Sequence, residues 1–270
     1  MNFFESFIYF LQNMQMNTPV RFGWFHFMWL LFVFVAVCFI FIKKKYNEKD
    51  LKLVLGVYGI TAFILELLKQ LIWSFNLDSV SNLVSWDYTW YAAPFQLCTM
   101  PIYVCLICLF LKKCKFRDYL LSFIAFVTIL GSISTMILPD SCFVSDTLVN
   151  VHTMWLHMGS FVVSVYLIIS KEVKLEILSV KKAWLVFLNF VGVALLLNIG
   201  IYKSGILNGE TFNMFYISPY FVSSLPIFNI IQENVPYILF LLIYVVALML
   251  GAFIIYLICK FISIFYKKMK

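Results

Sequence analysis

Seven long apolar runs constrain this chain more than any other feature of its sequence. Each has about 20 residues, the length that a helix needs to cross the hydrocarbon core of a bilayer. Because lipid cannot satisfy backbone N–H and C=O groups, each run must be helical. The sequence therefore predicts an all-α, polytopic membrane bundle with seven transmembrane helices. They are expected at residues 22–42, 53–75, 91–111, 119–138, 149–169, 184–202 and 236–258.

Composition supports a lipid environment. The 270 residues are 63% hydrophobic and 12% charged, with a mean hydropathy of +0.96, whereas soluble domains carry about 25% charged residues. The net charge of +7 does not indicate nucleic acid, because the lysines form short clusters between apolar runs. We expect a multi-pass protein of the cell membrane whose partners are lipids. The seven cysteines are odd in number and mostly lie in apolar runs, so no disulfide framework is predicted.

Loop charges alternate along the chain. The first, third and fifth connections and the C-terminal tail are rich in lysine, and the second and fourth contain Asp78, Asp87, Asp140 and Asp146 but no Lys or Arg. Positively charged loops stay in the cytoplasm. This pattern predicts an N-terminus outside and a C-terminus in the cytoplasm.

The expected organisation is one membrane domain with a short N-terminal addition. Residues 1–21 form an amphipathic surface segment, since Phe3, Phe4, Phe7, Ile8 and Leu11 recur at helical spacing. Residues 22–270 form a single seven-helix domain. Its sixth connection, residues 203–235, is a long outside loop that folds over the bundle or partly re-enters it.

Most polar residues within the predicted spans lie in the outer half of the bilayer, and all three histidines are among them. Ionisable groups at such depths are costly and face the interior or a wet cavity, so they indicate function. The set comprises His26, Glu66, Lys69, Gln70, Gln96, Cys98, Thr99, His152, Thr153, His157, Asn198, Tyr202 and Tyr237.

Two helix faces carry competing interpretations. Glu66 and Lys69 are three residues apart, so they form either an intrahelical ion pair or part of a site. Thr153, His157, Ser160 and Ser164 form one polar stripe, which either hydrogen-bonds neighbouring helices or lines a site. His152 lies about 140° from His157 at 3.6 residues per turn, and we expect it at the interface and not beside His157.

The third predicted span contains Cys98 one turn before Pro101. Pro101 cannot donate to the Leu97 carbonyl, so a kink is expected there. Gln96, Thr99 and Tyr103 share one face. Cys98 falls on a face of compact residues, where it serves either close packing or chemistry.

Several short motifs resemble one family. The stretch Pro94-Phe95-Gln96-Leu97-Cys98-Thr99 resembles the Leu-Pro-Leu-His-Leu-Cys motif of YwaF-type bacterial integral membrane proteins, which are grouped with transmembrane protein 164 of animals. Leu156-His157-Met158-Gly159, Glu66 and residues 131–139, 213–216 and 236–239 also match. Gln96 stands where the bacterial motif has His. The resemblance implies acyl transfer onto lysophospholipids through a Cys and a His, with Cys98 or Phe95 at the position of the family's Cys.

The first functional hypothesis is a lipid acyl-modifying enzyme, an acyltransferase or hydrolase. Cys98 is the predicted nucleophile and His157 its base. Glu66 or Asn198 would orient the base, and Gln96 would stabilise an oxyanion. The predicted substrate-binding residues are Gln96, Thr99, Thr153, Asn198 and Tyr237.

Two alternatives remain. A zinc-dependent membrane hydrolase would use His26, His152 and His157, although the five-residue spacing of the last two does not favour it. A binding or transport protein for a lipid or small polar solute needs no catalytic residue. The sequence predicts no cofactor or bound metal and leaves the oligomeric state open.

Overall fold

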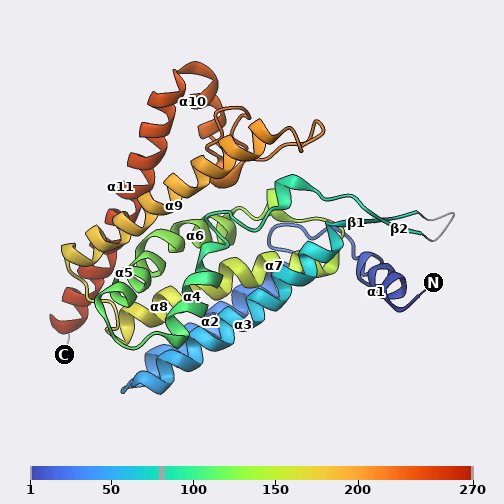
Figure 1. Cartoon of the computed structure of the whole chain (residues 1–270). Helices are drawn as coiled ribbons and strands as arrows, with labels where there is room; N and C mark the ends of the chain where they lie inside the picture. The colour runs from blue at the N-terminus through green and yellow to red at the C-terminus, as the bar shows by residue number, and fades with distance from the viewer. Residues whose placement is uncertain (1, 79–82, 269–270) are drawn as a thin grey trace.

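The computed structural model describes residues 2–78 and 83–268 and is an all-α polytopic bundle (Figure 1). Within these residues, six helical segments are long and apolar enough to cross a membrane. They are α2 (Trp24–Ile42), α3 (Glu48–Ile72), the continuous segment Lys115–Ile137, the continuous segment Thr147–Ile169, α9 (Ile177–Ser204) and α11 (Tyr237–Lys268).

Local sequence explains where several helices begin and end. Asn47 caps α3 by accepting hydrogen bonds from the backbone of Lys49 and Asp50, which satisfies N–H groups that have no partner within the helix. The Asp146 side chain accepts from the Val149 N–H at the start of α7 (Thr147–Met154). Gly205 ends α9 with a φ of 72°, a left-handed conformation that glycine adopts without strain.

The third predicted span differs from the expectation of a continuous helix. A 3-10 turn, η1 (Trp90–Ala92), is followed by irregular backbone, and α4 runs only from Met100 to Phe110. Pro101 therefore lies in the first turn of α4 and does not kink a longer helix. Proline is tolerated in a first helical turn, whereas residues that precede a proline avoid helical conformation. Cys98 and Gln96 thus lie in irregular backbone.

Two of the long helical segments, Lys115–Ile137 and Thr147–Ile169, are each interrupted by a π-helical turn. η2 (Ile124–Thr128) joins α5 (Lys115–Phe123) to α6 (Ile129–Ile137), and η4 (Trp155–Gly159) joins α7 to α8 (Ser160–Ile169). The Ser164 hydroxyl donates to the Ile124 carbonyl over 2.9 Å, and the Ser160 and Thr128 hydroxyls are 3.3 Å apart. Interhelical hydrogen bonding therefore accounts for the two serines of the predicted polar stripe.

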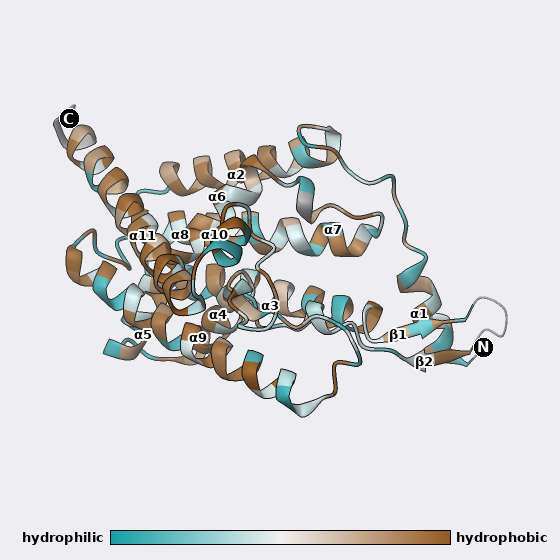
Figure 2. Ribbon diagram, turned by 90° about the horizontal axis from the view of Figure 1, so that it is seen from above, coloured by the Kyte–Doolittle hydropathy of each residue, from teal (hydrophilic) through white to brown (hydrophobic). Residues whose placement is uncertain are grey.

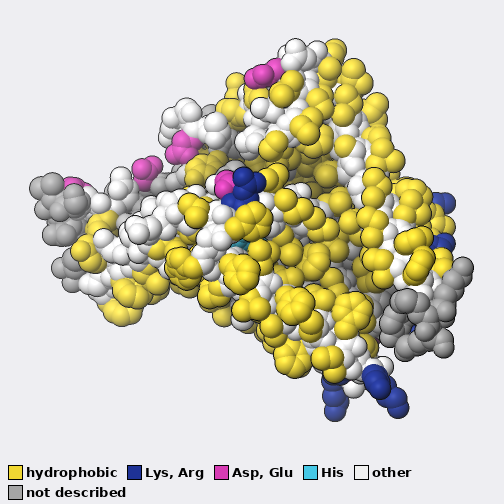
Figure 3. All heavy atoms as spheres, turned by 180° about the vertical axis from the view of Figure 1, so that it is seen from behind, with side chains coloured by type: hydrophobic (Ala, Val, Ile, Leu, Met, Phe, Trp, Pro, Cys, Tyr) yellow, Lys and Arg dark blue, Asp and Glu magenta, His cyan; other side chains and the backbone are white. Residues whose placement is uncertain are grey.

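The two ends of the bundle differ in charge. The α2–α3, α4–α5 and α8–α9 connections and the end of α11 lie at one end (Figure 1). Basic side chains gather along that edge and acidic ones at the opposite side (Figure 3). The helix exteriors between them are hydrophobic (Figures 2 and 3). We call the end with the acidic connections the outer end; it is the end that the charge pattern predicts to lie outside.

The outer end carries the irregular parts of the fold. A small antiparallel hairpin pairs β1 (Phe75–Leu77) with β2 (Val84–Trp86). The 3-10 turn η3 (Asp140–Cys142) precedes α7. The sixth connection contains the 3-10 turn η5 (Met214–Tyr216) and α10 (Phe228–Asn234), so it is an ordered loop over the bundle.

The N-terminal segment is helical, as its periodicity predicts. α1 (Phe3–Gln12) begins with a capping box between Asn2 and Glu5 and buries Ile8 and Leu11. It lies beside the β1–β2 hairpin (Figures 1 and 2). Phe3 and Phe10 are exposed. Because Ile8 and Leu11 pack on the protein, the apolar residues of this helix do not form one membrane-facing surface, and its place at a membrane surface stays a prediction.

Candidate functional site

A buried contact between α3 and α7 forms the centre of the candidate site. His152 Nε2 lies 2.8 Å from Glu66 Oε2, and the side chains are only 4% and 3% exposed. His152 Nδ1 is buried and has no hydrogen-bond partner in the described parts of the chain. A carboxylate that holds one imidazole nitrogen orients the ring and leaves the other nitrogen available for proton transfer.

Polar groups on the same face of α3 complete the environment of Glu66. Lys69 Nζ lies 2.8 Å from Glu66 Oε1, so the predicted intrahelical pair exists. Gln70 Nε2 donates to Glu66 Oε1 and to the Ala92 carbonyl, both over 2.8 Å. Glu66 therefore meets both an intrahelical partner and a partner on another helix, and the two interpretations of this face are compatible.

Tyr88 closes this network from the loop after β2. Its hydroxyl donates to Gln70 Oε1 over 2.9 Å. Burial raises the pKa of Tyr88 to about 12, and the negative charge of Glu66 acts in the same direction. The phenol is therefore a neutral hydrogen-bond donor at physiological pH.

The helix that carries His152 and His157 is not a regular α-helix. The π-helical turn η4 contains His157, and a π turn closes over five residues instead of four, so the 140° separation of an ideal helix does not apply. His152 is buried against Glu66 of α3. His157 is half-buried, and its role beside His152 stays a prediction.

Cys98 lies in the irregular backbone between η1 and α4 and is partly buried. The charges of Lys69 and Glu66 reach the Cys98 thiol electrostatically, and so does Tyr216 of η5. The thiol therefore lies in the same part of the bundle as the polar network that contains Glu66.

The two amides among the predicted substrate-binding residues, Gln96 and Asn198, both hydrogen-bond the outer loop, residues 203–235. Gln96 Nε2 donates to the Asn213 carbonyl over 3.0 Å, and Gln96 Oε1 accepts from the Phe215 N–H over 2.8 Å. Asn198 accepts from the Met214 N–H over 2.7 Å and donates to the Met214 carbonyl over 3.0 Å. The outer loop thus uses one donor and one acceptor of each amide, which gives Gln96 and Asn198 a structural role in holding that loop.

The hydrogen bonds from Gln96 and Asn198 hold a strained part of the outer loop at η5. Phe215 and Tyr216 have φ values of 58° and 59°, a left-handed conformation that is costly for bulky side chains and persists only where the surroundings enforce it. Tyr237 contributes to the same loop, since its hydroxyl donates to the Ile217 carbonyl over 2.7 Å. Thr99 caps the turn before α4 by accepting from the Gln96 N–H over 3.0 Å. Of the five predicted binding residues, only the half-buried Thr153 lies on the histidine helix.

The third histidine lies elsewhere. His26 Nδ1 accepts from the Phe22 N–H over 3.1 Å, and its ring packs against Phe143. Across residues 2–78 and 83–268, no group of three or more His, Cys, Asp or Glu side chains is placed to hold a metal ion. The donor arrangement therefore does not provide the three-histidine site of the zinc hypothesis.

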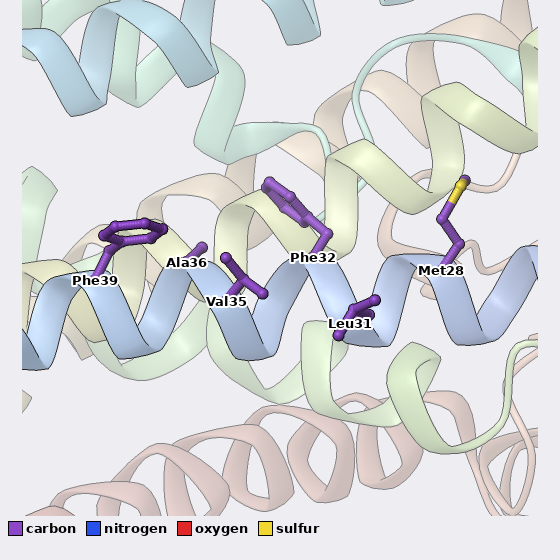
Figure 4. A pocket seen from close by; sticks show the side chains of 6 residues that line it. All are labelled: Met28, Leu31, Phe32, Val35, Ala36 and Phe39. Atoms are coloured by element: carbon purple, nitrogen blue, oxygen red, sulfur yellow. The ribbon is translucent and has the colours of Figure 1, made fainter.

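A pocket of about 430 Å³ lies along α2 and is separate from the polar network (Figure 4). Its lining is wholly apolar and comes from that helix alone: Met28, Leu31, Phe32, Val35, Ala36 and Phe39. Such a surface suits hydrocarbon and holds no group that could carry out chemistry.

Two residues of the network are hard to place from the sequence. The angle between His152 and His157 on an unbroken α-helix predicts His152 at the interface, and the π turn removes that premise. Tyr88 lies in a connection and gives no periodic signal. The shared predicted depth of Glu66 and His152 is the signal that could have paired them, because ionisable groups at one depth are expected to face one another.

A polytopic helical protein with a buried carboxylate–imidazole pair in its membrane domain is the class that these observations define. A family model described as the TMEM164 family matches residues 21–259. The chain belongs to the TMEM164 family of membrane proteins. No curated protein matches the chain, and no solved structure matches it.

Proposed function

We propose that this protein is a lipid acyl-modifying enzyme, an acyltransferase or hydrolase, that works in the outer half of the bilayer. The observation that carries the proposal is the 2.8 Å contact of His152 with Glu66, next to the region that contains Cys98. A thiol, an imidazole and a carboxylate that orients the imidazole are the components of nucleophilic acyl transfer. A site in the membrane domain also gives acyl chains direct access from lipid.

The proposed roles combine the Glu66–His152 contact with the roles that the sequence predicts. Cys98 is the nucleophile, and the histidines supply the base. Glu66 orients His152, so His152 joins the originally predicted His157 as a candidate for that role. The base takes the thiol proton, the thiolate attacks the ester carbonyl of a phospholipid, and a thioester forms as the lysolipid alkoxide leaves and takes the proton back. Water or a second lysolipid hydroxyl then attacks the thioester, which releases Cys98.

The test compares acyl composition of membrane lipids in cells that express the wild type, Cys98→Ala, His152→Ala or His157→Ala at equal abundance. Cys105→Ala is the matched control for the thiol, because Cys105 is fully buried in α4. His26→Ala is the control for a buried histidine outside the network. We expect the wild type and both control variants to change the acyl composition of the membrane lipids. Cys98→Ala should abolish this change, and so should the alanine variant of whichever histidine, His152 or His157, is the base.

Two results would contradict the proposal. A lipid change that Cys98→Ala leaves intact would remove the thiol mechanism. If no strain changes its lipids while the protein is folded and in the membrane, enzyme action on lipids is wrong.

A second candidate function, solute binding or transport, rests on α4. Its 11 residues and the irregular backbone before it form a broken helix at a place where a full span was predicted, and broken helices surround the binding sites of transporters. Solute-dependent flux that is insensitive to Cys98→Ala would favour this function over acyl transfer.

A further inference from the structure

The N-terminal segment 2–16 contacts both helices that supply the Glu66–His152 pair. Its first anchor is Gln12, the last residue of α1. The Gln12 amide nitrogen donates to the carbonyls of Ile72 over 3.1 Å and Phe75 over 2.6 Å. Ile72 is the last residue of α3, so Gln12 satisfies a carbonyl that has no partner within the helix. Phe4 packs edge-on against Phe75, with ring centroids 5.1 Å apart.

The second anchor is on the chain just before α7. The Met16 N–H donates to the Ser145 carbonyl and the Thr147 N–H donates to the Met14 carbonyl, each over 2.8 Å. These two bonds flank Gln15 and Asp146, which form an antiparallel bridge. Asp146 is the N-cap of α7, and His152 lies in the second turn of that helix. One short segment therefore joins the outer end of α3 to the start of α7.

This segment lies outside the region that the family model matches, and yet it is packed onto the bundle. The family match begins at residue 21, so residues 2–16 lie before the part of the chain that the family model describes. Ile8 and Leu11 are 0% and 2% exposed, which shows that α1 is packed onto the bundle. A loosely attached tail would not bury two large apolar side chains and cap a helix end.

We propose that residues 2–16 form a brace that ties α3 to α7 at the outer end and thereby sets the geometry of the Glu66–His152 pair, with Gln12 as a positioning residue. This inference rests on the proposed function for its catalytic consequence. The pair spans two helices, so a shift of one helix against the other separates the carboxylate from the imidazole. Misplacement by about 1 Å can cost about a hundredfold in rate.

The experiment uses full-length Gln12→Leu, Gln12→Lys and Gln15→Leu proteins in vesicles of phosphatidylethanolamine and phosphatidylglycerol that contain isotope-labelled lysophosphatidylethanolamine. Leu removes the donor, whereas Lys restores a donor for the two carbonyls. Gln15→Leu is the matched control, because the exposed Gln15 side chain donates only to the Gln12 carbonyl within the same segment. Two quantities are measured: acyl turnover, and amide hydrogen exchange of the outer ends of α3 and α7.

We expect Gln12→Leu to raise exchange at these two helix ends by about tenfold, since it leaves the part-buried carbonyls of Ile72 and Phe75 without this donor. Turnover should fall by about tenfold to a hundredfold. Gln12→Lys should restore both quantities, and Gln15→Leu should leave both near the wild-type values. Unchanged exchange and turnover in Gln12→Leu would overturn the brace.

A disulfide lock distinguishes a brace from a moving lid. Gln15 and Asp146 form a non-hydrogen-bonded pair, whose Cα atoms lie about 4.5 Å apart, a separation that a disulfide can bridge. The double variant Gln15→Cys/Asp146→Cys should keep its turnover when oxidised, relative to the same protein reduced. Turnover that is lost on oxidation and recovered on reduction would show that the segment must open, which contradicts a brace.

The exchange data separate the two proposals. If Cys98→Ala matches the wild type in turnover, the proposed function is wrong, and exchange in Gln12→Leu still decides whether the brace exists. If Cys98→Ala abolishes turnover while Gln12→Leu changes nothing, the function stands and the brace is wrong.

Discussion

Two contacts between a carboxylate and a cationic or ionisable side chain join helices at opposite ends of this bundle. At the outer end, Glu66 and His152 are both more than nine-tenths buried. At the opposite, lysine-rich end, which we call the inner end, Arg117 is 1% exposed but its partner Glu48 is 47% exposed. A guanidinium stays charged at all physiological pH values, whereas an imidazole gains and loses its proton near neutrality.

The two contacts also differ in the further groups that surround them. Arg117 also lies 3.9 Å from Glu172 and donates to the Leu111 carbonyl, so it ties α3, α5 and the α8–α9 connection together. A thiol lies within electrostatic range of each contact, Cys98 at the outer end and Cys108 beside Arg117. Among the described residues, only the outer contact includes an imidazole. The comparison therefore teaches that the two contacts differ in the presence of a group that can transfer a proton near neutral pH.

The same substitution at both ends should give the largest contrast. Glu66→Gln leaves Lys69 and His152 buried without their carboxylate, and breaking a buried pair in this way costs about 3–5 kcal/mol. Reversible unfolding of the purified protein in mixed detergent micelles measures the change. A loss below about 1 kcal/mol would show that the outer pair is not electrostatically coupled.

Glu48→Gln is the matched variant at the inner end, and a smaller effect is expected. Glu48 is half exposed, so water screens its charge, and Arg117 keeps its contacts with Glu172 and the Leu111 carbonyl. The free energy of unfolding should fall by about 1 kcal/mol, with acyl turnover unchanged. A loss equal to that of Glu66→Gln, measured under the same conditions, would remove the contrast between the two ends.

Tyr88→Phe should give the smallest change. It removes one neutral hydrogen bond to Gln70 and leaves the aromatic packing of the ring, so the cost is about 0.5–1.5 kcal/mol. The pKa of Tyr88 is raised to about 12 in the folded protein, so the hydrogen bond from its neutral hydroxyl is lost only at strongly alkaline pH. The difference in free energy of unfolding between the variant and the wild type should therefore be the same at pH 6 and at pH 8. A difference that changes between these two pH values would contradict a neutral donor.

Apolar length and loop charge carried most of the fold prediction. Six of the seven expected spans correspond to helices long enough to cross a membrane, because a run of about 20 apolar residues has no other stable structure in lipid. The remaining one, the third expected span at residues 91–111, is not confirmed as a continuous helix, since α4 begins only at Met100. Pro94 and Pro101 were visible in the sequence, but whether a proline kinks a helix or starts one depends on what packs around it.

The sequence by itself determined that the chain is a helical membrane protein, and it predicted that most of the polar residues within the spans share one depth. Only the tertiary structure decided which of them meet. Helical periodicity gives the angle of a side chain about its own axis and says nothing of the neighbouring helix. Gln96 and Phe215 are 119 positions apart, yet they form a hydrogen bond, and Glu66 of α3 meets His152 of α7. Those pairings depend on packing between distant segments, which local sequence does not encode.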